Sequence, residues 1–234
     1  MNILGKIRAL AAELGAVGAG AYVLHRGLAS IGGGFYLYHF VAQPVSTGPL
    51  LTKGRGQSIT VREVDLNRGW QLGDLPLTPE VVSYRQKQGS VCLCAFKEGH
   101  IFGCLWLCLG PYQEDEVRCL MVPAPRGEVS WDFDVYVRPE RRLGPTFARL
   151  WEVANQYLGQ HGIGWSVSRI SAANRRSLGA HARLGAQRIG SAIFLRLGRM
   201  QLMISSLWPF AHISLGPTST PTLVLQVPHR GQET

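Results

Sequence analysis

The chain has 234 residues, of which 46% are hydrophobic and 17% charged, and its formal net charge is +9. This length and apolar content exclude a wholly disordered chain and suit one domain with terminal extensions. The positive charge indicates an anionic partner, such as nucleic acid, acidic lipid or a phosphorylated cofactor, without choosing among them.

The N-terminal part of the chain predicts an extension before the main domain. Residues 2–29 predict a helix that a Gly- and Ala-rich middle weakens. We expect this helix to pack on the domain or to lie on a membrane surface, because the chain has no apolar stretch of about 18 residues that would span a bilayer. Phe35–Val41 predicts a strand, and residues 44–57, rich in Pro, Gly and Thr, predict a linker.

From Ser58 onward, strand and helix patterns alternate. Thr78-Pro79-Glu80 predicts a helix start, with a hydroxyl N-cap, a proline in the first turn and an acid beside it. Lys97-Glu98-Gly99-His100 separates two apolar runs and predicts a hairpin. Strands are expected from Ile59 to Val64 and at Val91–Phe96, Ile101–Leu109 and Val117–Val122.

The segment Val129–Val137 has the clearest strand pattern. Hydrophobic residues at alternate positions predict one core face, and Asp132, Asp134 and Tyr136 fall between them. We therefore expect the two carboxylates and the phenol on the face away from the core.

The following segment predicts a basic loop, residues 139–144, and then a helix that ends at Gly159 or Gly162. Its apolar stripe consists of Phe147, Leu150, Trp151, Ala154 and Leu158. Beyond it, strands are expected at Trp165–Ile170 and Ile189–Leu197, with a helix between them from Asn174 to about Leu184. The tail after Gly216 is expected to be loose, unless Thr222–Val227 pairs as a strand.

Five cysteines form an odd set that contains no C-x-x-C pair. Cys92 and Cys94 lie two apart in an apolar run, so a strand would place both on one face. We interpret all five as reduced, buried residues of a cytosolic protein rather than as zinc ligands. The set is Cys92, Cys94, Cys104, Cys108 and Cys119.

Arginine is concentrated between Arg138 and Arg188, where the only acidic residues are Glu140 and Glu152. Arginine suits bidentate contact with phosphate oxygens, and the N–H groups at a helix N-terminus bind anions. The loop Arg141-Arg142-Leu143-Gly144-Pro145-Thr146 combines arginines, a glycine and a helix start. It predicts a phosphate site, and a solvated basic surface is the alternative interpretation.

Two motifs resemble signatures of the GNAT superfamily of acetyltransferases. Residues 174–186 resemble N-x-x-(S/A)-x-x-x-Y-x-x-L-G-F, with Asn174, Ser177 and Leu184-Gly185 matching and His181 in place of the usual tyrosine. Residues 137–144 resemble the acyl-CoA loop V-x-P-E-x-R-x-x-G-x-G/A. Aligned on its valine the loop is one residue short, and aligned on its glycine it carries Thr146 where Gly or Ala is usual. The resemblance covers about residues 58–198.

The resemblance implies an α+β fold with a mixed, mostly antiparallel twisted sheet flanked by helices on both faces. It also implies that acetyl-CoA, or another acyl-CoA, binds between Val135 and Leu184. The backbone of Val135–Val137 would pair with the pantetheine arm, and the loop amides from Arg142 to Thr146 would hold the pyrophosphate. The implied cofactor-binding residues are Val135, Tyr136, Val137, Arg141, Arg142, Leu143, Gly144, Pro145, Thr146, Asn174 and Ser177.

The activity implied is N-acyl transfer in which an amine attacks the thioester directly. His181 is the expected general acid, because an imidazole titrates near neutrality and can donate a proton. Asp132 or Asp134 is the expected general base, directly or through a water molecule. The alternative interpretations are a surface histidine without a catalytic role and two ordinary solvated carboxylates.

Three other functions stay open at this point: transfer of a longer acyl chain to an amino acid or amino sugar, a catalytically inactive binding module of the same fold, and a nucleic-acid-binding module. The third is disfavoured because the arginines lie on a loop and a helix start rather than along one face. We expect a small-molecule amine acceptor, no nucleic acid, peripheral membrane contact at most, and a cytoplasmic location. The expected organisation is an extension at 1–57, the acyltransferase domain at 58–198 and a partly loose extension at 199–234.

Overall fold

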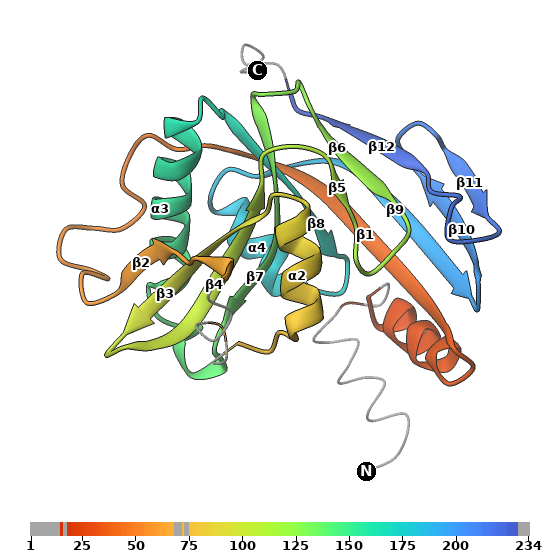
Figure 1. The fold of residues 1–234 in the computed structure, drawn as a ribbon, viewed down its shortest axis with the longest axis horizontal. Coiled ribbons are helices and arrows are strands. Elements are labelled where there is room, and N and C mark those ends of the chain that lie inside the picture. Colours follow the sequence, from red (N-terminus) through yellow and green to blue (C-terminus); the bar gives the residue numbers. More distant parts are fainter. Residues whose placement is uncertain (1–14, 16–17, 68–71, 73–74, 229–234) are drawn as a thin grey trace. The chain divides into compact units, whose positions relative to one another are not determined.

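The computed structural model describes residue 15 and residues 18–67, 72 and 75–228 (Figure 1). The chain divides into two compact units. Unit 1 consists of residues 1–43, 113–124 and 167–234, and unit 2 of residues 44–112 and 125–166. Most of the predicted N-terminal helix lies outside the described residues, and residues 18–29 of it are helical. The predicted division at residues 57 and 198 stays a prediction.

Unit 2 contains an antiparallel sheet with the strand order β7-β4-β3-β2. These strands are β7 (Val129–Val137), β4 (His100–Cys108), β3 (Val91–Lys97) and β2 (Thr60–Glu63). The hairpin predicted at residues 97–100 joins β3 to β4. Strand β8 (Trp165–Ser171) begins in this unit, and the Ser130 hydroxyl of β7 hydrogen-bonds Trp165 O and Ser166 Oγ.

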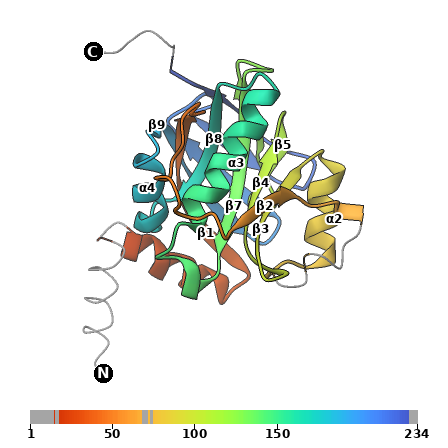
Figure 2. The same cartoon turned by 90° about the vertical axis from the view of Figure 1, so that its left-hand side faces the viewer.

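Helices cover both faces of the unit 2 sheet. Helix α3 (Thr146–Gln160) lies against β4, β3, β2 and β7, as Figure 2 shows, and its predicted stripe is buried apart from Phe147. Gly103 of β4 permits the close approach, because a Cβ there would lie 3.3 Å from Thr146 Cγ2 and 3.4 Å from Leu150 Cδ1. Helix α2 (Pro79–Lys87) covers the other face, where Arg85 stacks on Trp106 and Phe133.

Unit 1 contains the strand order β11-β10-β9-β1-β8. Strand β1 (Gly33–Pro44) pairs antiparallel with β9 (Gln187–Leu197) (Figure 1). Tyr38 and Phe40 of β1 are buried, and the centre of the Tyr38 ring lies 6.0 Å from that of Phe194 in β9. The predicted strand at Phe35–Val41 is therefore confirmed. Strands β10 (Met200–Ser205) and β11 (Ala211–Ser214) continue the antiparallel pairing beyond β9.

A second, smaller sheet of unit 1 contains the only parallel pair whose register is defined among the described residues. Strand β12 (Thr222–Gln226) runs parallel to β6 (Leu120–Ala124), and Leu223 and Leu225 are fully buried there. The short strand β5 (Tyr112–Gln113) lies beside β6 in this sheet. The C-terminal tail thus forms the strand given as the alternative to a loose end.

In each unit, a side chain predicted to cap a helix does so. Thr78 caps α2 through a bond from the Val81 amide, and Asn174 caps α4 (Arg175–Ala182) through a bond from the Ser177 amide. All five cysteines are buried thiols, as predicted, and the Sγ atoms of Cys92 and Cys94 lie 3.5 Å apart on one face of β3. Within the described residues, no helix is both long and apolar enough to cross a membrane.

Candidate functional site

A pocket of about 210 Å³ opens at the N-terminal end of α3, within unit 2. The loop that follows β7 forms one wall, and the ends of β3 and β4 contribute another. Lys97 and Phe102 line the pocket and were not among the predicted site residues, because Lys97 was interpreted only as part of a turn. The residues of the pocket that carry the argument are Lys97, Phe102, Glu140, Arg141, Gly144 and Thr146.

No side chain caps the N-terminus of α3. Pro145 occupies the N-cap and offers no side-chain hydrogen bond, and the first turn contains no acidic residue. The first N–H groups of a helix have no intrahelical acceptor, and they carry partial positive charge. Lys97 and Arg141 add two cations to the same pocket, against the single carboxylate of Glu140. The pocket is therefore suited to an anion.

The loop between β7 and α3 is folded on itself. Its residues Pro139–Arg141 form one turn of 3-10 helix, and the amides of Arg142 and Gly144 donate to Pro139 O at 3.3 Å and Arg141 O at 3.1 Å. These two amides therefore do not point at a ligand, which corrects the prediction that they hold a pyrophosphate. The Arg142 guanidinium is also engaged, since Nε donates to Val137 O at 2.9 Å.

Arg141 and Leu143 extend differently from this loop. The Arg141 guanidinium lies 5.8 Å from the centre of the Phe102 ring, on the wall of the pocket. The Leu143 side chain is 93% exposed and contributes nothing to the pocket. Of the predicted loop residues, the structure places Arg141, Gly144, Pro145 and Thr146 at the pocket and directs Arg142 and Leu143 elsewhere.

A β-bulge interrupts β7 next to the predicted acyl-pantetheine segment. Cys104 pairs with Tyr136 and Trp106 with Phe133, so two residues of β7, Asp134 and Val135, oppose one residue of β4. A bulge leaves the extra residue outside the ladder, and bulges are frequent beside active sites. Val135 and Tyr136 are half-buried and Val137 is buried.

Asp134 sits at the bulge in a backbone conformation that side chains rarely adopt. Its φ is +51°, and its carboxylate accepts a 2.6 Å bond from Arg85 Nη1. The Asp134 side chain is 40% exposed, whereas that of Arg85 is 7% exposed. Asp134 thus reaches solvent, as predicted, but as the counter-charge of a buried arginine that the sequence did not link to it.

Replacing Asp134 by Asn is expected to destabilise the protein by about 1–3 kcal/mol, because Arg85 loses a charged acceptor while Asn tolerates the positive φ. Denaturant unfolding followed by tryptophan fluorescence measures this. The matched control is Glu98→Asn, at a φ of +53° and with an exposed ion pair 3.8 Å long, where we expect a change within about 0.5 kcal/mol. Equal losses in the two variants would show that the ion pair contributes nothing.

Asp132 is buried, which corrects the prediction that it faces away from the core. Asp132 is only 1% exposed, and its Oδ2 accepts a 2.8 Å hydrogen bond from Ser166 Oγ. Strand β7 is buried on both faces from Val129 to Phe133, because α2 and α3 cover the two faces of its sheet. The alternation of residue types does not show this double coverage.

His181 is buried in unit 1, at 2% exposure, and its Nδ1 lies 3.0 Å from Gln43 Oε1. An amide oxygen only accepts, so Nδ1 carries the hydrogen of the neutral ring. Burial lowers the pKa of His181 to about 4. The expectation of near-neutral titration is therefore wrong, and so is the alternative of a surface histidine.

Asn174 and Ser177, the other motif residues of unit 1, cap α4. Asn174 Oδ1 accepts from the Ser177 amide at 3.0 Å, so the motif asparagine fixes the start of a helix. The predicted cofactor residues thus fall in two sets, Val135–Thr146 in unit 2 and Asn174 with Ser177 in unit 1.

Comparisons with known proteins support the fold. No family model matches the chain, and no curated protein matches it by sequence. A protein of unknown function from Staphylococcus epidermidis matches at a TM-score of 0.50 with 10% identity, over 75% of this chain and 66% of its own. A tandem GNAT protein from the clavulanic acid biosynthesis pathway matches at 0.49 with 13% identity, over 73% and 57%. A GCN5-related glucosamine N-acetyltransferase region of a fungal multi-domain β-N-acetylglucosaminidase matches at 0.49 with 15% identity, over 75% and 22%.

Identities this low concern the fold alone. The chain spans about two thirds or less of each of these proteins. The observed α+β architecture, with a mostly antiparallel sheet, one parallel pair of defined register among the described residues and helices on both faces of unit 2, agrees with the prediction. The likeness to the Staphylococcus epidermidis protein supports this fold, and the resemblance to the GNAT superfamily rests on the two sequence motifs.

Proposed function

We propose that this protein is an acyl-CoA-dependent N-acyltransferase that transfers an acetyl group from acetyl-CoA to an amine. The observation that carries the proposal is the uncapped N-terminus of α3, which opens on a pocket lined by Lys97 and Arg141. This pocket lies in the loop whose sequence resembles the GNAT acyl-CoA loop. The resemblance of residues 137–144 and 174–186 to GNAT motifs also supports the proposal, because members of that superfamily use acyl-CoA.

The residues of the pocket fit a pyrophosphate. Two phosphate groups carry negative charge that the α3 N-terminus, Lys97 and Arg141 would balance, and Glu140 is the one opposing carboxylate of the lining. Gly144 adds no side chain to the wall of the pocket, and the atom nearest to a Cβ built there would be Arg141 O, at 3.3 Å. Thr146, at the first helical position, would present its backbone N–H to the same oxygens.

The bulge on β7 supplies backbone groups beside this pocket's loop. Val135 and Tyr136 lie just after the extra residue of the bulge, and we propose that their backbone groups hold the pantetheine amides. Acetyl-CoA supplies an activated thioester when bound. The protein's part is to align an amine with the thioester carbonyl and to take its proton.

Asp134 is the proposed general base, because it is the exposed carboxylate of the predicted pair and lies at the bulge. Asp132 is enclosed and hydrogen-bonded to Ser166. His181 would be neutral at pH 7, so it would act as an acid only from the neutral ring. We propose that His181 positions α4 and Gln43 rather than donating a proton.

Replacing Arg141 or Lys97 by Ala is expected to weaken coenzyme A binding about tenfold each, because each removes one cation from the phosphate pocket. Calorimetric titration with coenzyme A and acetyl-CoA measures this. Arg126→Ala is the matched control, since Arg126 is an exposed arginine in a turn of the same unit, outside the pocket. An equal loss of affinity in Arg126→Ala and Arg141→Ala would mean that coenzyme A binding depends on the net charge of the protein and not on the pocket.

Turnover separates an enzyme from a binding module of the same fold. Hydrolysis of acetyl-CoA and acetyl transfer to a panel of amines are both measured through the free thiol of the coenzyme A that they release. Binding without turnover for any amine would identify the inactive module, and tighter binding of octanoyl- or palmitoyl-CoA would identify the longer-chain alternative. The proposal would be overturned if none of the acyl-CoA compounds bound.

A further inference from the structure

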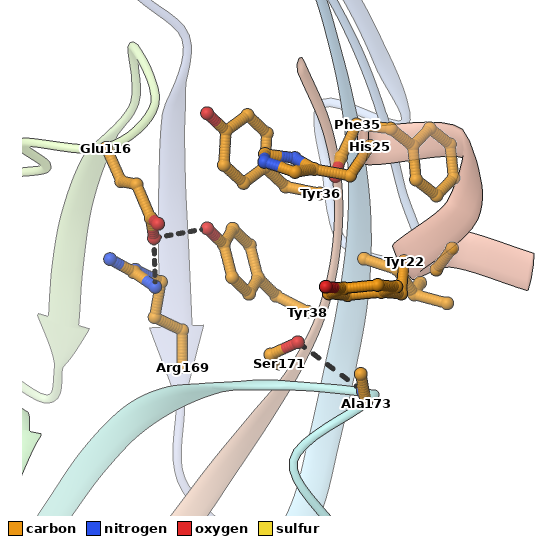
Figure 3. Close-up of a pocket in the computed structure, with 11 residues that line it drawn as sticks. Tyr22, His25, Phe35, Tyr36, Tyr38, Glu116, Arg169, Ser171 and Ala173 are labelled. Carbon is orange, nitrogen blue, oxygen red and sulfur yellow. Dashed lines mark hydrogen bonds and ion pairs between the residues drawn. The ribbon is translucent and has the colours of Figure 1, made fainter. Parts of the chain in front are cut away.

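A second pocket, of about 230 Å³, lies within unit 1 (Figure 3). The helix at residues 18–29 and strand β1 form its aromatic side. Glu116, in the segment before β6, and Arg169 of β8 form its charged side. None of these residues belongs to the coenzyme A pocket of unit 2.

Aromatic rings line one side of the pocket. Tyr36 lies edge-on to His25, with centroids 5.1 Å apart at 73°, and is stacked on Tyr38 at 6.0 Å. Tyr22 points into the same space from the helix and is 43% exposed (Figure 3). The faces of such rings attract cations, and tyrosine hydroxyls add dipoles.

The charged side of the pocket has a surplus of carboxylates. Arg169 pairs with Glu114 at 2.7 Å and Glu116 at 2.9 Å, and Asp115 lies 4.0 Å away. One guanidinium thus faces three carboxylates, and its flat side rests 4.5 Å above the Tyr38 ring. Arg169 is therefore unsuited to receive an anionic ligand as well.

Glu116 is the carboxylate that reaches the opening of the pocket. Its Oε2 accepts from Tyr38 Oη at 2.6 Å and from Arg169 Nη1, while the side chain stays 49% exposed. Within the described residues, both of these contacts are made by Oε2, and Oε1 accepts no hydrogen bond. Arg196 binds the backbone oxygen of Glu116 at 2.8 Å and does not line the pocket.

We propose that this pocket binds a small organic cation, a primary or methylated ammonium carried on an apolar or aromatic body. The aromatic faces of Tyr22 and Tyr36 would hold the body and share the positive charge, and Glu116 Oε1 would accept from the ammonium or balance its charge. The pocket volume is below the range of about 300–1,000 Å³ usual for drug-sized ligands, so the ligand is small. The site does not depend on acyl transfer.

Ligand-observed NMR titration with phenethylamine, 2-phenylethanol and phenylacetate tests the charge requirement. The three probes share the aromatic body and differ in the polar end, so the cation should bind at least about tenfold more tightly than the alcohol. The anion should bind no better than the alcohol. Equal binding of amine and alcohol, or no binding of phenethylamine, would overturn the proposal.

Variants assign the binding to this pocket. Glu116→Gln should weaken phenethylamine binding at least about tenfold, and Tyr22→Leu should weaken it several-fold without affecting the fold, since Tyr22 is on an exposed helix face. Glu98→Gln, an exposed carboxylate in unit 2, is the control and should leave binding unchanged. Coenzyme A affinity should be the same in Glu116→Gln and Tyr22→Leu as in the parent chain, so failure here is distinguishable from failure of the proposed transferase activity. Unchanged amine binding in both Glu116→Gln and Tyr22→Leu would place the amine elsewhere and refute the site.

Discussion

Replacing Arg169 by Met is expected to lower the free energy of unfolding by about 3–5 kcal/mol at neutral pH, because removing one partner of a buried ion pair leaves uncompensated charge. The side chains of Arg169 and Glu114 are 16% and 1% exposed, and their charged atoms lie 2.7 Å apart. Glu116 also pairs with Arg169, at 2.9 Å. Without the guanidinium, neighbouring carboxylates would face one another with little water to screen them.

Denaturant unfolding of Arg169→Met at two pH values separates charge from packing. Burial raises the pKa of Glu114 to about 7, so at pH 5 this carboxyl is mostly protonated and the loss should be smaller than at pH 8. Arg176→Met, at an exposed position on α4, is the control and should change stability by less than about 0.5 kcal/mol. In a Glu114→Gln background the loss from Arg169→Met should shrink, as a double-mutant cycle detects. The same loss at both pH values and in both backgrounds would contradict an ionic origin.

The sequence predicted those elements whose cause lies within a few residues. Thr78 and Asn174 were recognised as caps because a cap bonds an amide three residues ahead, and both bonds are present. The apolar stripe of α3 was visible for the same reason, since a helix repeats every few residues. The hairpin between β3 and β4 also follows from adjacent residues.

The edge strands of unit 1 were not predicted. Residues 199–216 were interpreted as an extension, yet β10 pairs with β9 and β11 pairs with β10. Several of their apolar side chains, such as Ile204 and Ile213, are exposed, at 50% and 60%. The buried face of β10 carries the polar residues Gln201 and Ser205 beside Met203, so residue type does not follow burial and the period-two pattern that identifies a strand is weak.

The misplaced site residues all depend on partners distant in sequence. Asp132 was expected on a solvated face, but it is buried because α2 and α3 cover the two faces of the sheet that contains β7. His181 was expected to titrate near neutrality, but it is buried, and its ring hydrogen-bonds Gln43, which is far away in the chain. Nothing local in either motif reports such burial. The chemistry of a site residue was therefore harder to predict than its place in an element.

Glu114 and His181 are expected to make opposite contributions to stability over the same pH range. Burial raises the pKa of Glu114 to about 7 from 4.5, so between these values the folded chain keeps a proton that the unfolded chain has lost. The stability that this proton supplies is present below pH 4.5 and is lost as pH rises toward 7. Burial lowers the pKa of His181 to about 4 from 6.5, so stability from the neutral ring is present above pH 6.5 and lost as pH falls.

The two effects are expected to oppose each other in the unmodified chain between pH 4.5 and 6.5. One pKa unit corresponds to about 1.4 kcal/mol, and each group alone would change the free energy of unfolding by about 2 kcal/mol over this range. Glu114→Gln should therefore show stability that rises with pH by about that amount relative to the parent. His181→Asn, which keeps an amide donor toward Gln43, should show stability that falls.

Guanidinium titrations at closely spaced pH values, followed by tryptophan fluorescence, measure both slopes as differences from the parent chain. Other titrating groups cancel in these differences, because each variant changes one side chain. The double variant Glu114→Gln with His181→Asn should return to a flat difference, since both linked protons are gone. Parallel curves for the parent and the single variants would mean that neither group titrates differently in the folded and unfolded chains. His181 would then be accessible to solvent protons near neutrality, and the general-acid role that its burial argues against would become the better reading of the motif.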